Sequence, residues 1–377
     1  MNKIYMAGDF HFGIYKFKQD KWLKMMLDYF YTDFLPYIKN TYKEGDIFIF
    51  GGDLFDNRDA ISVEVKYKAE LLMKDIQDII PTYMLIGNHD MSNKSTVNNK
   101  VNSIHTLGWL PNIKIINKPE VIKWKNLDLV LMPFFDKKQD MINAISIHKG
   151  DLAFVHSDLN GCRLNMNSVS NRNTDMIDVN YFKDYKHVYS SHVHIRQVLS
   201  NFTFIGSPYE QDRGDLGNQK GIQIIYEDFS TDFIPNKTSP IFEKIIIKTE
   251  EDLIKFEKIN PNNYTDLEIY NSVIVNSRKT RKKIESILEQ GSFAKIDYIN
   301  DLTKIDNITE DKANIITENI DFTKINTSTD GSVEFDTIIL NYINYIDYES
   351  DKIKDGVIKE FELVKEKHKI LYGNLHS

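Results

Sequence analysis

Cysteine and long apolar runs are both scarce in this chain. Cys162 is the single cysteine among 377 residues, so no disulfide can form within the chain, which fits a reducing compartment. The longest apolar runs, such as residues 47–50, are strand-sized and fall short of the roughly 20 residues needed to cross a bilayer. The first residues lack a charged segment followed by an apolar stretch, so we expect no signal peptide and a cytoplasmic location.

Positive charge is outweighed by negative charge. The chain has 47 Lys and Arg against 55 Asp and Glu, which gives a net charge of −8. This excess counts against a protein that holds nucleic acid by overall charge alone. It does not exclude a nuclease, because bound divalent cations reverse the local sign where a phosphate lies, and Lys and Arg can gather on one face.

The chain has enough hydrophobic residues, 41% of the total, to bury a substantial core. Its 20 Tyr and 22 Phe argue against global disorder. In residues 1–234 we predict helices at 20–39, 62–80 and 96–107, and strands at 3–7, 46–50, 82–86, 114–116, 121–124, 127–132, 152–155, 187–190, 202–205 and 222–226. Helices alternate with strands at first and strands dominate later. This order predicts an α/β fold of packed sheets flanked by helices.

The remaining residues differ in character. A linker at 235–240 leads to a small α+β domain at 242–296, with strands expected at 242–248 and 272–277 and helices expected from 249 and at 281–290. Residues 297–335 are polar and aperiodic, so we expect a connecting linker. Residues 336–377 are predicted to be helical, and the last helix carries an apolar face.

Five predicted strands end in side chains that bind metal ions. These are Asp9 and His11, Asp53 and Asp56, Asn88 with His89 and Asp90, His156, and the pair His192 and His194. Ligand sites of open α/β sheets lie at the carboxyl ends of strands, so the five ends would meet in one crevice. Each piece alone is common, since D-x-H is most often structural or solvated and GNHD contains turn-forming residues. Together, in order and each after a strand-like run, they predict a two-metal site.

The residue types favour particular metals. Imidazole and carboxylate together suit Mn, Fe or Zn rather than Ca or Mg alone. In extended chain, side chains at i and i+2 point to one side, so Asp9 and His11 can serve one cluster, as can His192 and His194. A carboxylate such as Asp53 can bridge two cations. Two cations about 3.5 to 4 Å apart can clamp a phosphoryl oxygen for in-line attack.

The order D-x-H, GD-x-x-D, GNHD, a lone His and H-x-H resembles the calcineurin-like phosphoesterases. Within them, GDLFD followed by a helix, GNHD and a late GSPYEQ resemble the SbcD family of double-strand-break repair nucleases, which includes the meiotic-recombination nuclease of the MRN complex. The match is nearest to the nuclease subunits of phage recombination complexes. The resemblance covers residues 1 to about 230 and continues weakly as domain order. It implies an αββα sandwich, a small cap domain, a helical C-terminal segment and, for a phage-encoded chain, the host cytoplasm.

The resemblance also implies roles for single residues. One metal would be held by Asp9, His11 and His194, the other by Asn88, His156 and His192, with Asp53 bridging them; the metals would be Mn²⁺, or alternatively Mg²⁺. His89 would not be a ligand but would lie beside the scissile phosphate, stabilising the transition state or protonating the leaving oxygen, with its ring oriented by Asp90. The alternative for His89 is a histidine that only supports the ligands.

Two positions depart from the family pattern. The residue before H-x-H is commonly Gly and is Ser191 here. Because Ser is small, we expect little effect of this difference on the site. Asp56 stands where some cellular members carry a His that is implicated in exonuclease chemistry, so the balance of exonuclease and endonuclease activity stays open. Asp56 is a candidate for a carboxylate that holds a ligand histidine.

Further residues are candidates for contacts outside the metal site. Arg58 and Arg196 are close in sequence to the ligands and could contact phosphate or be ordinary surface arginines. Residues 206–209 would border the site or form an ordinary turn. In the cap domain, phosphate contacts are expected from Arg278, Arg281, Lys282 and Lys283, and the alternative is a solvated helix start.

The resemblance also implies partners. The family places its C-terminal helical segment on the coiled-coil root of an SbcC-like ATPase, although an apolar helix face could equally pack on this chain's own core. Family members form homodimers through helices that correspond here to 62–80 and 96–107, whose apolar residues suit either a core or an interface.

Three functions compete. The first is a Mn²⁺-dependent DNA nuclease that works as a dimer with an ATPase. The second is a phosphatase of the same fold acting on phosphoprotein or small phosphate esters, because one fold and metal site serve many substrates. Protein phosphatases of this fold show GDxVDRG and GNHE, whereas this chain has GGDLFDNR and GNHD, which favours the nuclease. The third is a non-catalytic binding subunit, against which the complete ligand set argues.

Overall fold

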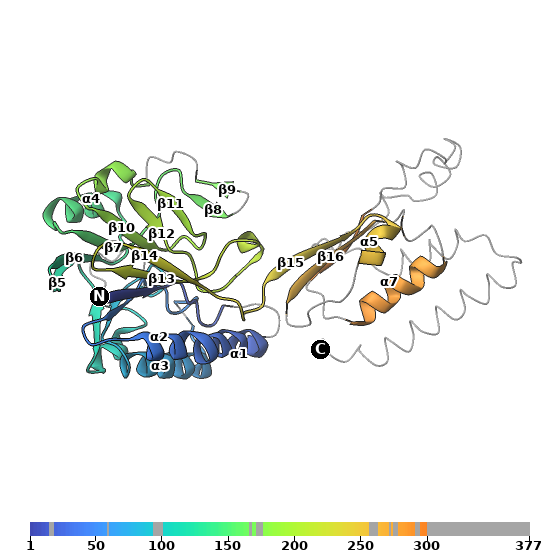
Figure 1. Cartoon of the computed structure of the whole chain (residues 1–377), viewed down its shortest axis with the longest axis horizontal. Helices are drawn as coiled ribbons and strands as arrows, with labels where there is room; N and C mark the ends of the chain where they lie inside the picture. The colour runs from blue at the N-terminus through green and yellow to red at the C-terminus, as the bar shows by residue number, and fades with distance from the viewer. Residues whose placement is uncertain are drawn as a thin grey trace, which may run out of the picture. The chain divides into compact units, whose positions relative to one another are not determined.

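The computed structural model describes residues 1–14, 19–58, 60–92, 101–165, 168–170, 176–255, 263–270, 273, 278–290 and 295–299. The larger part of these residues forms two six-stranded sheets with helices outside them (Figure 1).

The first sheet has the strand order β14-β13-β1-β2-β3-β4. Its strands are β1 (Lys3–Ala7), β2 (Ile47–Phe50), β3 (Thr82–Leu85), β4 (Ile113–Ile116), β13 (Gly221–Tyr226) and β14 (Thr231–Pro235). β1 to β4 are parallel, whereas β13 runs antiparallel to both β1 and β14. The carboxyl ends of β1, β2 and β3 therefore lie at the same edge.

The second sheet has the strand order β11-β12-β10-β7-β6-β5. Its strands are β5 (Glu120–Trp124), β6 (Leu127–Met132), β7 (Leu152–His156), β10 (His187–Ser191), β11 (Gln197–Leu199) and β12 (Phe202–Phe204). The four central strands are parallel, and each edge strand is antiparallel to its neighbour. β7 and β10 are adjacent, so their carboxyl ends also meet.

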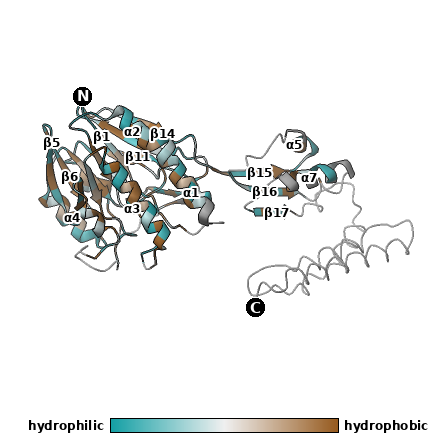
Figure 2. Cartoon of the chain, turned by 90° about the horizontal axis from the view of Figure 1, so that it is seen from below, coloured by the Kyte–Doolittle hydropathy of each residue, from teal (hydrophilic) through white to brown (hydrophobic). Residues whose placement is uncertain are grey.

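Alternate residues of each strand enter different cores. In β1, Ile4 and Met6 belong to a buried cluster between the two sheets, whereas Tyr5 and Ala7 pack against the outer helices. Burial of both faces explains why the strands are almost continuously apolar. Figure 2 shows the contrast between largely hydrophobic strands and helices that carry hydrophilic residues as well. The predicted fold class, an α/β sandwich of two mixed sheets flanked by helices, is confirmed.

The helices cover the two outer faces. The predicted helix at 20–39 consists of α1 (Gln19–Tyr29), the π-helical η1 (Phe30–Phe34) and α2 (Leu35–Thr41). α3 (Val63–Gln77) begins at Ser62, whose side chain accepts a hydrogen bond from the Val65 N–H as an N-cap. These helices pack on the first sheet. On the second sheet lie α4 (Lys138–Ile147) and η3 (Val179–Phe182), which the sequence analysis did not predict.

Other local departures are short elements. Of the helix expected at 96–107, residues 101–104 are not helical and η2 (His105–Trp109) is a 3-10 turn, while 96–100 lie outside the described residues. The hairpin of β8 (Arg163–Asn165) and β9 (Ser168–Val169) and the turn η4 (Arg213–Asp215) were also not predicted.

A third, three-stranded sheet has the order β15-β16-β17. It contains β15 (Phe242–Ile247), β16 (Tyr264–Tyr270) and β17 (Lys295–Ile299), with α5 (Glu250–Lys255) and α7 (Arg278–Gln290). The strand expected at 272–277 is wrong at its one described residue, Val273, which is helical. β16 takes the place beside β15 because its alternating pattern buries Leu267 and Ile269 in one apolar cluster with residues of α7. β17 also runs past the expected boundary at 296.

Residues 300–377 lie outside the described residues, so the predicted linker beyond β17 and the predicted C-terminal helical segment stay predictions. In the part of the chain that the structure describes, no helix has both the length and the apolar character to cross a membrane.

Candidate metal centre

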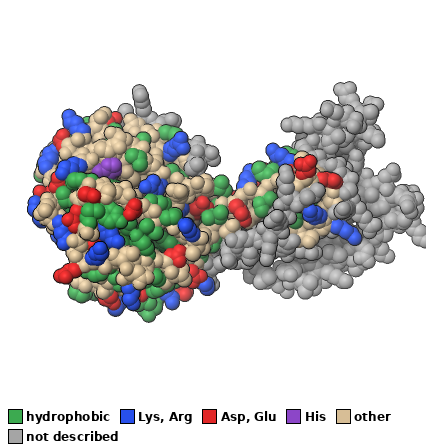
Figure 3. Space-filling model, in the orientation of Figure 1, with side chains coloured by type: hydrophobic (Ala, Val, Ile, Leu, Met, Phe, Trp, Pro, Cys, Tyr) green, Lys and Arg blue, Asp and Glu red, His purple; other side chains and the backbone are tan. Residues whose placement is uncertain are grey.

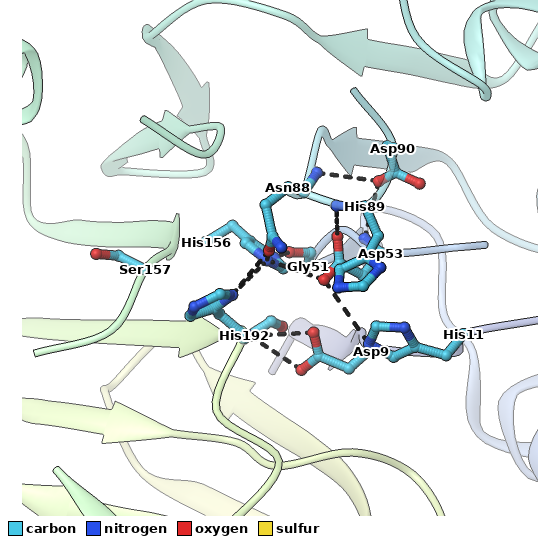
Figure 4. A network of polar contacts seen from close by, with 12 residues as sticks. Asp9, His11, Gly51, Asp53, Asn88, His89, Asp90, His156, Ser157 and His192 are labelled. Carbon is cyan, nitrogen blue, oxygen red and sulfur yellow. Dashed lines mark hydrogen bonds and ion pairs between the residues drawn. The ribbon is translucent and has the colours of Figure 1, made fainter. Parts of the chain in front are cut away.

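The polar residues that end five parallel strands meet at one place (Figure 4). They follow β1, β2 and β3 of the first sheet and end or follow β7 and β10 of the second. Most are buried: Asp9 and His156 have no exposed surface, and Asp53 is 1% exposed. Both sheets thus contribute side chains to a single centre.

Four of the expected ligands have an unusual backbone conformation. The φ angles of Asp9, His11, Asp53 and His192 are +54°, +48°, +58° and +84°. Non-glycine residues rarely adopt positive φ, and each instance costs on the order of 1–3 kcal/mol that the surrounding structure must offset. Such strain concentrates at functional sites, so this observation supports a functional centre independently of the residue types.

One group of donor atoms comes from Asp9, His11 and His194. Nε2 of His194 lies 3.2 Å from Nε2 of His11, with the ring planes at 61°. The Asp9 carboxylate accepts hydrogen bonds from the His192 N–H at 3.0 Å to each oxygen, which fixes its direction. The three side chains therefore point toward a common position.

A second group comes from Asn88, His156 and His192. Oδ1 of Asn88 lies 2.8 Å from Nδ1 of His192 and 3.0 Å from Nε2 of His156, and these two nitrogens are 3.2 Å apart. The Nδ1–H of His156 donates to the Gly51 carbonyl at 2.7 Å, which leaves Nε2 facing the centre.

Asp53 lies between the two groups. Its Oδ2 is 3.7 Å from Nε2 of His11 and 3.3 Å from Nε2 of His156. Its Oδ1 accepts a hydrogen bond from the backbone N–H of His89 at 2.8 Å. One carboxylate thus reaches both sets of donor atoms, which is the arrangement a bridging ligand requires.

The donor set fits divalent cations. Two ring nitrogens 3.2 Å apart direct lone pairs into the same space, and a shared cation satisfies both. Burial lowers the pKa of His192 to about 3 and that of His194 well below its ordinary value, so both rings are neutral and able to bind a metal. Burial raises the pKa of Asp9 to about 6, because a buried carboxylate ionises reluctantly unless positive charge lies beside it.

Asp90, which was expected to orient the His89 ring, instead connects two loops of the centre. Its carboxylate accepts backbone hydrogen bonds from the N–H groups of Asp53, Leu54 and Gly87 at 2.8, 3.0 and 2.9 Å. It therefore joins the loops that follow β2 and β3 instead of orienting the His89 ring. The residue types did not indicate this role, because the partners are backbone N–H groups, which almost every residue has.

The His89 ring is oriented by Asp56. Nδ1 of His89 lies 2.5 Å from the Asp56 carbonyl oxygen, which can only accept, so Nδ1 carries the proton. Oδ1 of Asp56 lies 3.3 Å from Nδ1 of His11. Asp56 therefore contacts both histidines, and its carboxylate occupies the position from which it can hold His11 with Nε2 toward the centre.

The two arginine candidates differ. The Arg196 guanidinium lies over the Phe233 ring, 4.4 Å from its centroid, and donates to Gln223 Oε1 at 3.1 Å. It is engaged with β13 and β14, which does not support the expected phosphate contact. Arg58 lies in the loop after Asp53 and stays a candidate for a phosphate contact.

The basic residues expected to contact DNA from the cap domain are described only in part. Lys282 and Lys283 on α7 are exposed, and the side chains of Arg278 and Arg281 lie outside the described residues.

Three residues near the centre were missed or undervalued by the sequence analysis. The Phe134 ring lies 5.9 Å from that of His192 and 6.1 Å from that of His156, with no sequence signal beyond an aromatic residue after a strand. Tyr209 and Gln211 of GSPYEQ are each 1% exposed and donate to backbone carbonyls of the loop after β1. Two residues of the motif therefore hold the loop that carries Asp9 and His11.

The close approach of strand ends requires glycine. A Cβ at Gly51 would lie 1.8 Å from Oγ and 2.8 Å from Cβ of Ser191. Gly51→Ala is therefore expected to lower the free energy of unfolding by about 1–3 kcal/mol through overpacking, as measured by urea denaturation of the metal-free protein.

Ser191→Gly provides the control, because it removes both clashing atoms and the next contact of the new Cβ would be an ordinary 3.6 Å to Gly8. The double variant should recover most of the lost stability. Equal destabilisation of the single and double variants would show that the Ser191 contact is not the cause.

A profile of the calcineurin-like phosphoesterase family matches residues 3–196, which contain all the expected ligands. The chain belongs to the calcineurin-like phosphoesterase family. This family binds two divalent metal ions, and its members are hydrolases, so the centre belongs to a phosphoester-hydrolysing enzyme.

Individual relatives are viral. The chain is 26% identical over 242 residues to Exonuclease subunit 1 of Enterobacteria phage T4, covering 63% of this chain and 68% of the relative. It is 24% identical over 234 residues to a protein of Invertebrate iridescent virus 6 that is described as a phosphoesterase, covering 60% of this chain and 77% of the relative. Among solved structures, the calcineurin-like phosphoesterase YfkN from Bacillus subtilis matches with a TM-score of 0.33 and 10% identity, covering 62% of this chain and 88% of that one.

Proposed function

We propose that this phosphoesterase is a Mn²⁺-dependent DNA nuclease that hydrolyses phosphodiester bonds as a subunit of an SbcCD/MRN-like recombination and DNA-end-processing complex. The observation that carries the proposal is the relationship to the phage T4 protein, whose name specifies an exonuclease subunit. The motifs GDLFD, GNHD and GSPYEQ support the same family of nucleases.

The proposed ligand set follows the two groups of donor atoms. Asp9, His11 and His194 would hold one cation, Asn88, His156 and His192 the other, and Asp53 both. When bound, such cations supply Lewis acidity toward the phosphoryl oxygens. The chain itself contributes fixed directions, because the backbone bonds to Asp9, Asp53 and His156 hold the donors before a metal arrives.

His89 is the proposed catalytic side chain. Its ring centroid lies 4.8 Å from that of His11, at the centre, and the residue is only partly buried. Since Nδ1 donates its proton to the Asp56 carbonyl, Nε2 is the ring nitrogen left for a substrate. In this position it would stabilise charge at the scissile phosphate or transfer a proton to the leaving oxygen.

DNA would be held by local rather than overall charge. On the face in Figure 3, Lys and Arg side chains lie among Asp and Glu instead of forming one large basic patch. The exposed Lys282 and Lys283 on α7 and the partly buried Arg58 remain the proposed phosphate contacts. Such contacts add affinity that falls as salt concentration rises.

The proposal is tested with purified protein, Mn²⁺ and end-labelled single- and double-stranded DNA, with a model phosphomonoester in parallel and EDTA as the metal-free control. We expect metal-dependent DNA cleavage. Phosphomonoester hydrolysis without DNA cleavage, even after an ATPase partner is added, would overturn the nuclease proposal and leave a phosphatase of the same fold.

Partners are also proposed. An SbcC-like ATPase would bind the C-terminal segment 336–377, in line with the word subunit in the name of the T4 relative.

A homodimer would form through α3 and η2, where Val63, Tyr67 and Trp109 are 87%, 60% and 80% exposed. Sedimentation equilibrium should show a dimer that Trp109→Glu dissociates, and a monomeric wild type would refute this arrangement.

A further inference from the structure

The loop after β1 is held on two sides. The N–H groups of Asp9 and His11 donate to the carbonyls of Gly52 and Asp53 at 2.9 and 3.0 Å. On the opposite side, the carbonyl of Asp9 accepts a hydrogen bond from the Gln211 side-chain amide, and the carbonyl of Phe10 accepts one from the Tyr209 hydroxyl. The peptide groups of this loop are thus satisfied by residues about 40 and 200 positions away.

These bonds matter because the loop is strained. Asp9 and His11 both have positive φ, a conformation that persists only where several contacts determine it. The loop is not extended as the sequence analysis assumed, and it is this positive-φ conformation that directs the Asp9 carboxylate and the His11 imidazole toward one position. Loss of a carbonyl partner would let the loop relax toward ordinary φ values and move the two donors apart.

The loop after β10, in which His192 has positive φ, is held by the same segment. Nζ of Lys220 donates to the carbonyl of His194 at 2.6 Å, to Oγ of Ser207 at 2.9 Å and to Oδ1 of Asp215 at 2.7 Å. Asp215 in turn accepts the Gln211 N–H at 2.8 Å. Lys220 and Asp215 are 6% and 3% exposed, and a buried ion pair with such complete hydrogen bonding fixes geometry more than it adds stability.

We propose that residues 207–220 form a positioning element for one half of the metal centre, in which Tyr209 and Gln211 hold the loop of Asp9 and His11 while Lys220 holds the backbone of His194. Asp9, His11 and His194 form a single group of donor atoms, and among the described residues the segment makes no hydrogen bond to the second group of Asn88, His156 and His192. The element therefore sets the affinity of one cation site and leaves the other unaffected. The inference rests on the proposed ligand set but not on DNA being the substrate.

The test compares two variants with two matched controls. Tyr209→Phe and Gln211→Met remove the carbonyl partners of the loop. Tyr185→Phe removes another buried hydroxyl that donates to a carbonyl, that of His148 at 2.6 Å, and Gln77→Met replaces another buried glutamine, 3% exposed on α3. All four should lose a similar stability of about 0.5–1.5 kcal/mol in urea denaturation.

Mn²⁺ binding by calorimetry on the full chain separates positioning from stability. The wild type should bind two cations. Tyr209→Phe and Gln211→Met should weaken one of the two sites by about 10–100-fold and leave the other unchanged, while the controls keep both. Hydrogen exchange should become faster at the amides of residues 9–12 in these two variants alone.

The outcomes are distinct. Unchanged affinity at both sites in Tyr209→Phe and Gln211→Met overturns the positioning role. Equal weakening in the two controls shows a general effect of stability and overturns it as well. A wild type that binds no Mn²⁺, Mg²⁺ or Zn²⁺ overturns the ligand set itself and the inference with it. Intact two-site binding without DNA cleavage overturns the nuclease proposal alone, and the selective loss at one site would still support the element.

Discussion

His89→Ala is expected to slow Mn²⁺-dependent DNA cleavage by about 10²–10⁴-fold while both cations still bind. The ring is oriented by its Nδ1 bond to the Asp56 carbonyl, and Nε2 is the nitrogen available to substrate. The backbone N–H of His89, which supports Asp53, is unaffected by the substitution. The measurements are the single-turnover cleavage rate at saturating Mn²⁺ and the number of bound cations.

His148→Ala is the matched control, because Nδ1 of His148 also bonds a carbonyl, that of Ala144 at 2.9 Å, on the outer face of the second sheet. It should cleave DNA at the wild-type rate. A His89→Ala protein that keeps more than about a tenth of the rate would exclude a catalytic role. One that loses a bound cation would instead make His89 a ligand, in keeping with donor atoms of His11, Asp56 and His89 that lie within 4.8 Å of one another.

Asp53→Asn is expected to lower cleavage by at least about 10³-fold, since stabilisation of several kcal/mol by the metals corresponds to this factor. The amide has nearly the same shape, so packing is kept. It lacks the charge that allows one oxygen, 3.7 Å from His11 and 3.3 Å from His156, to serve two cations. Calorimetry should show weakened binding at both sites, in contrast to the one-site effect expected of Tyr209→Phe.

The control for this substitution is Asp46→Asn. Asp46 is fully buried and accepts backbone hydrogen bonds from Lys3 and Lys43 at 3.0 and 2.9 Å, far from the centre in the fold. Its variant should lose stability but keep both cations and the cleavage rate. If Asp53→Asn binds two cations with wild-type affinity, the bridging assignment is wrong.

Much of the fold could be predicted because its signals are local. The strand at 3–7 was predicted with the bounds of β1, since the buried run and the Gly-Asp turn after it lie within one short window. The convergence of Asp53 with His156 followed from a rule about carboxyl ends of parallel strands, not from any knowledge of their distance. The resemblance to the calcineurin-like phosphoesterases rested on the same short motifs, and the match over residues 3–196 confirmed it. The strand predicted at 272–277 was wrong at Val273, and the strand beside β15, which is β16, was not predicted.

The residues themselves thus determined the fold class, the metal-binding chemistry and the group of side chains at the strand ends, because each depends on residue type and short spacing. Only the tertiary structure decided which polar groups meet. It joined Asp90 to three backbone N–H groups, Arg196 to Phe233, and Gln211 to the carbonyl of Asp9. Backbone donors and acceptors are identical at almost every residue, so the sequence has no mark for the partner that a buried side chain will find. That choice is made when the strands pair, which places β1 beside β13 about 200 residues later in the chain, and when the two sheets then pack together.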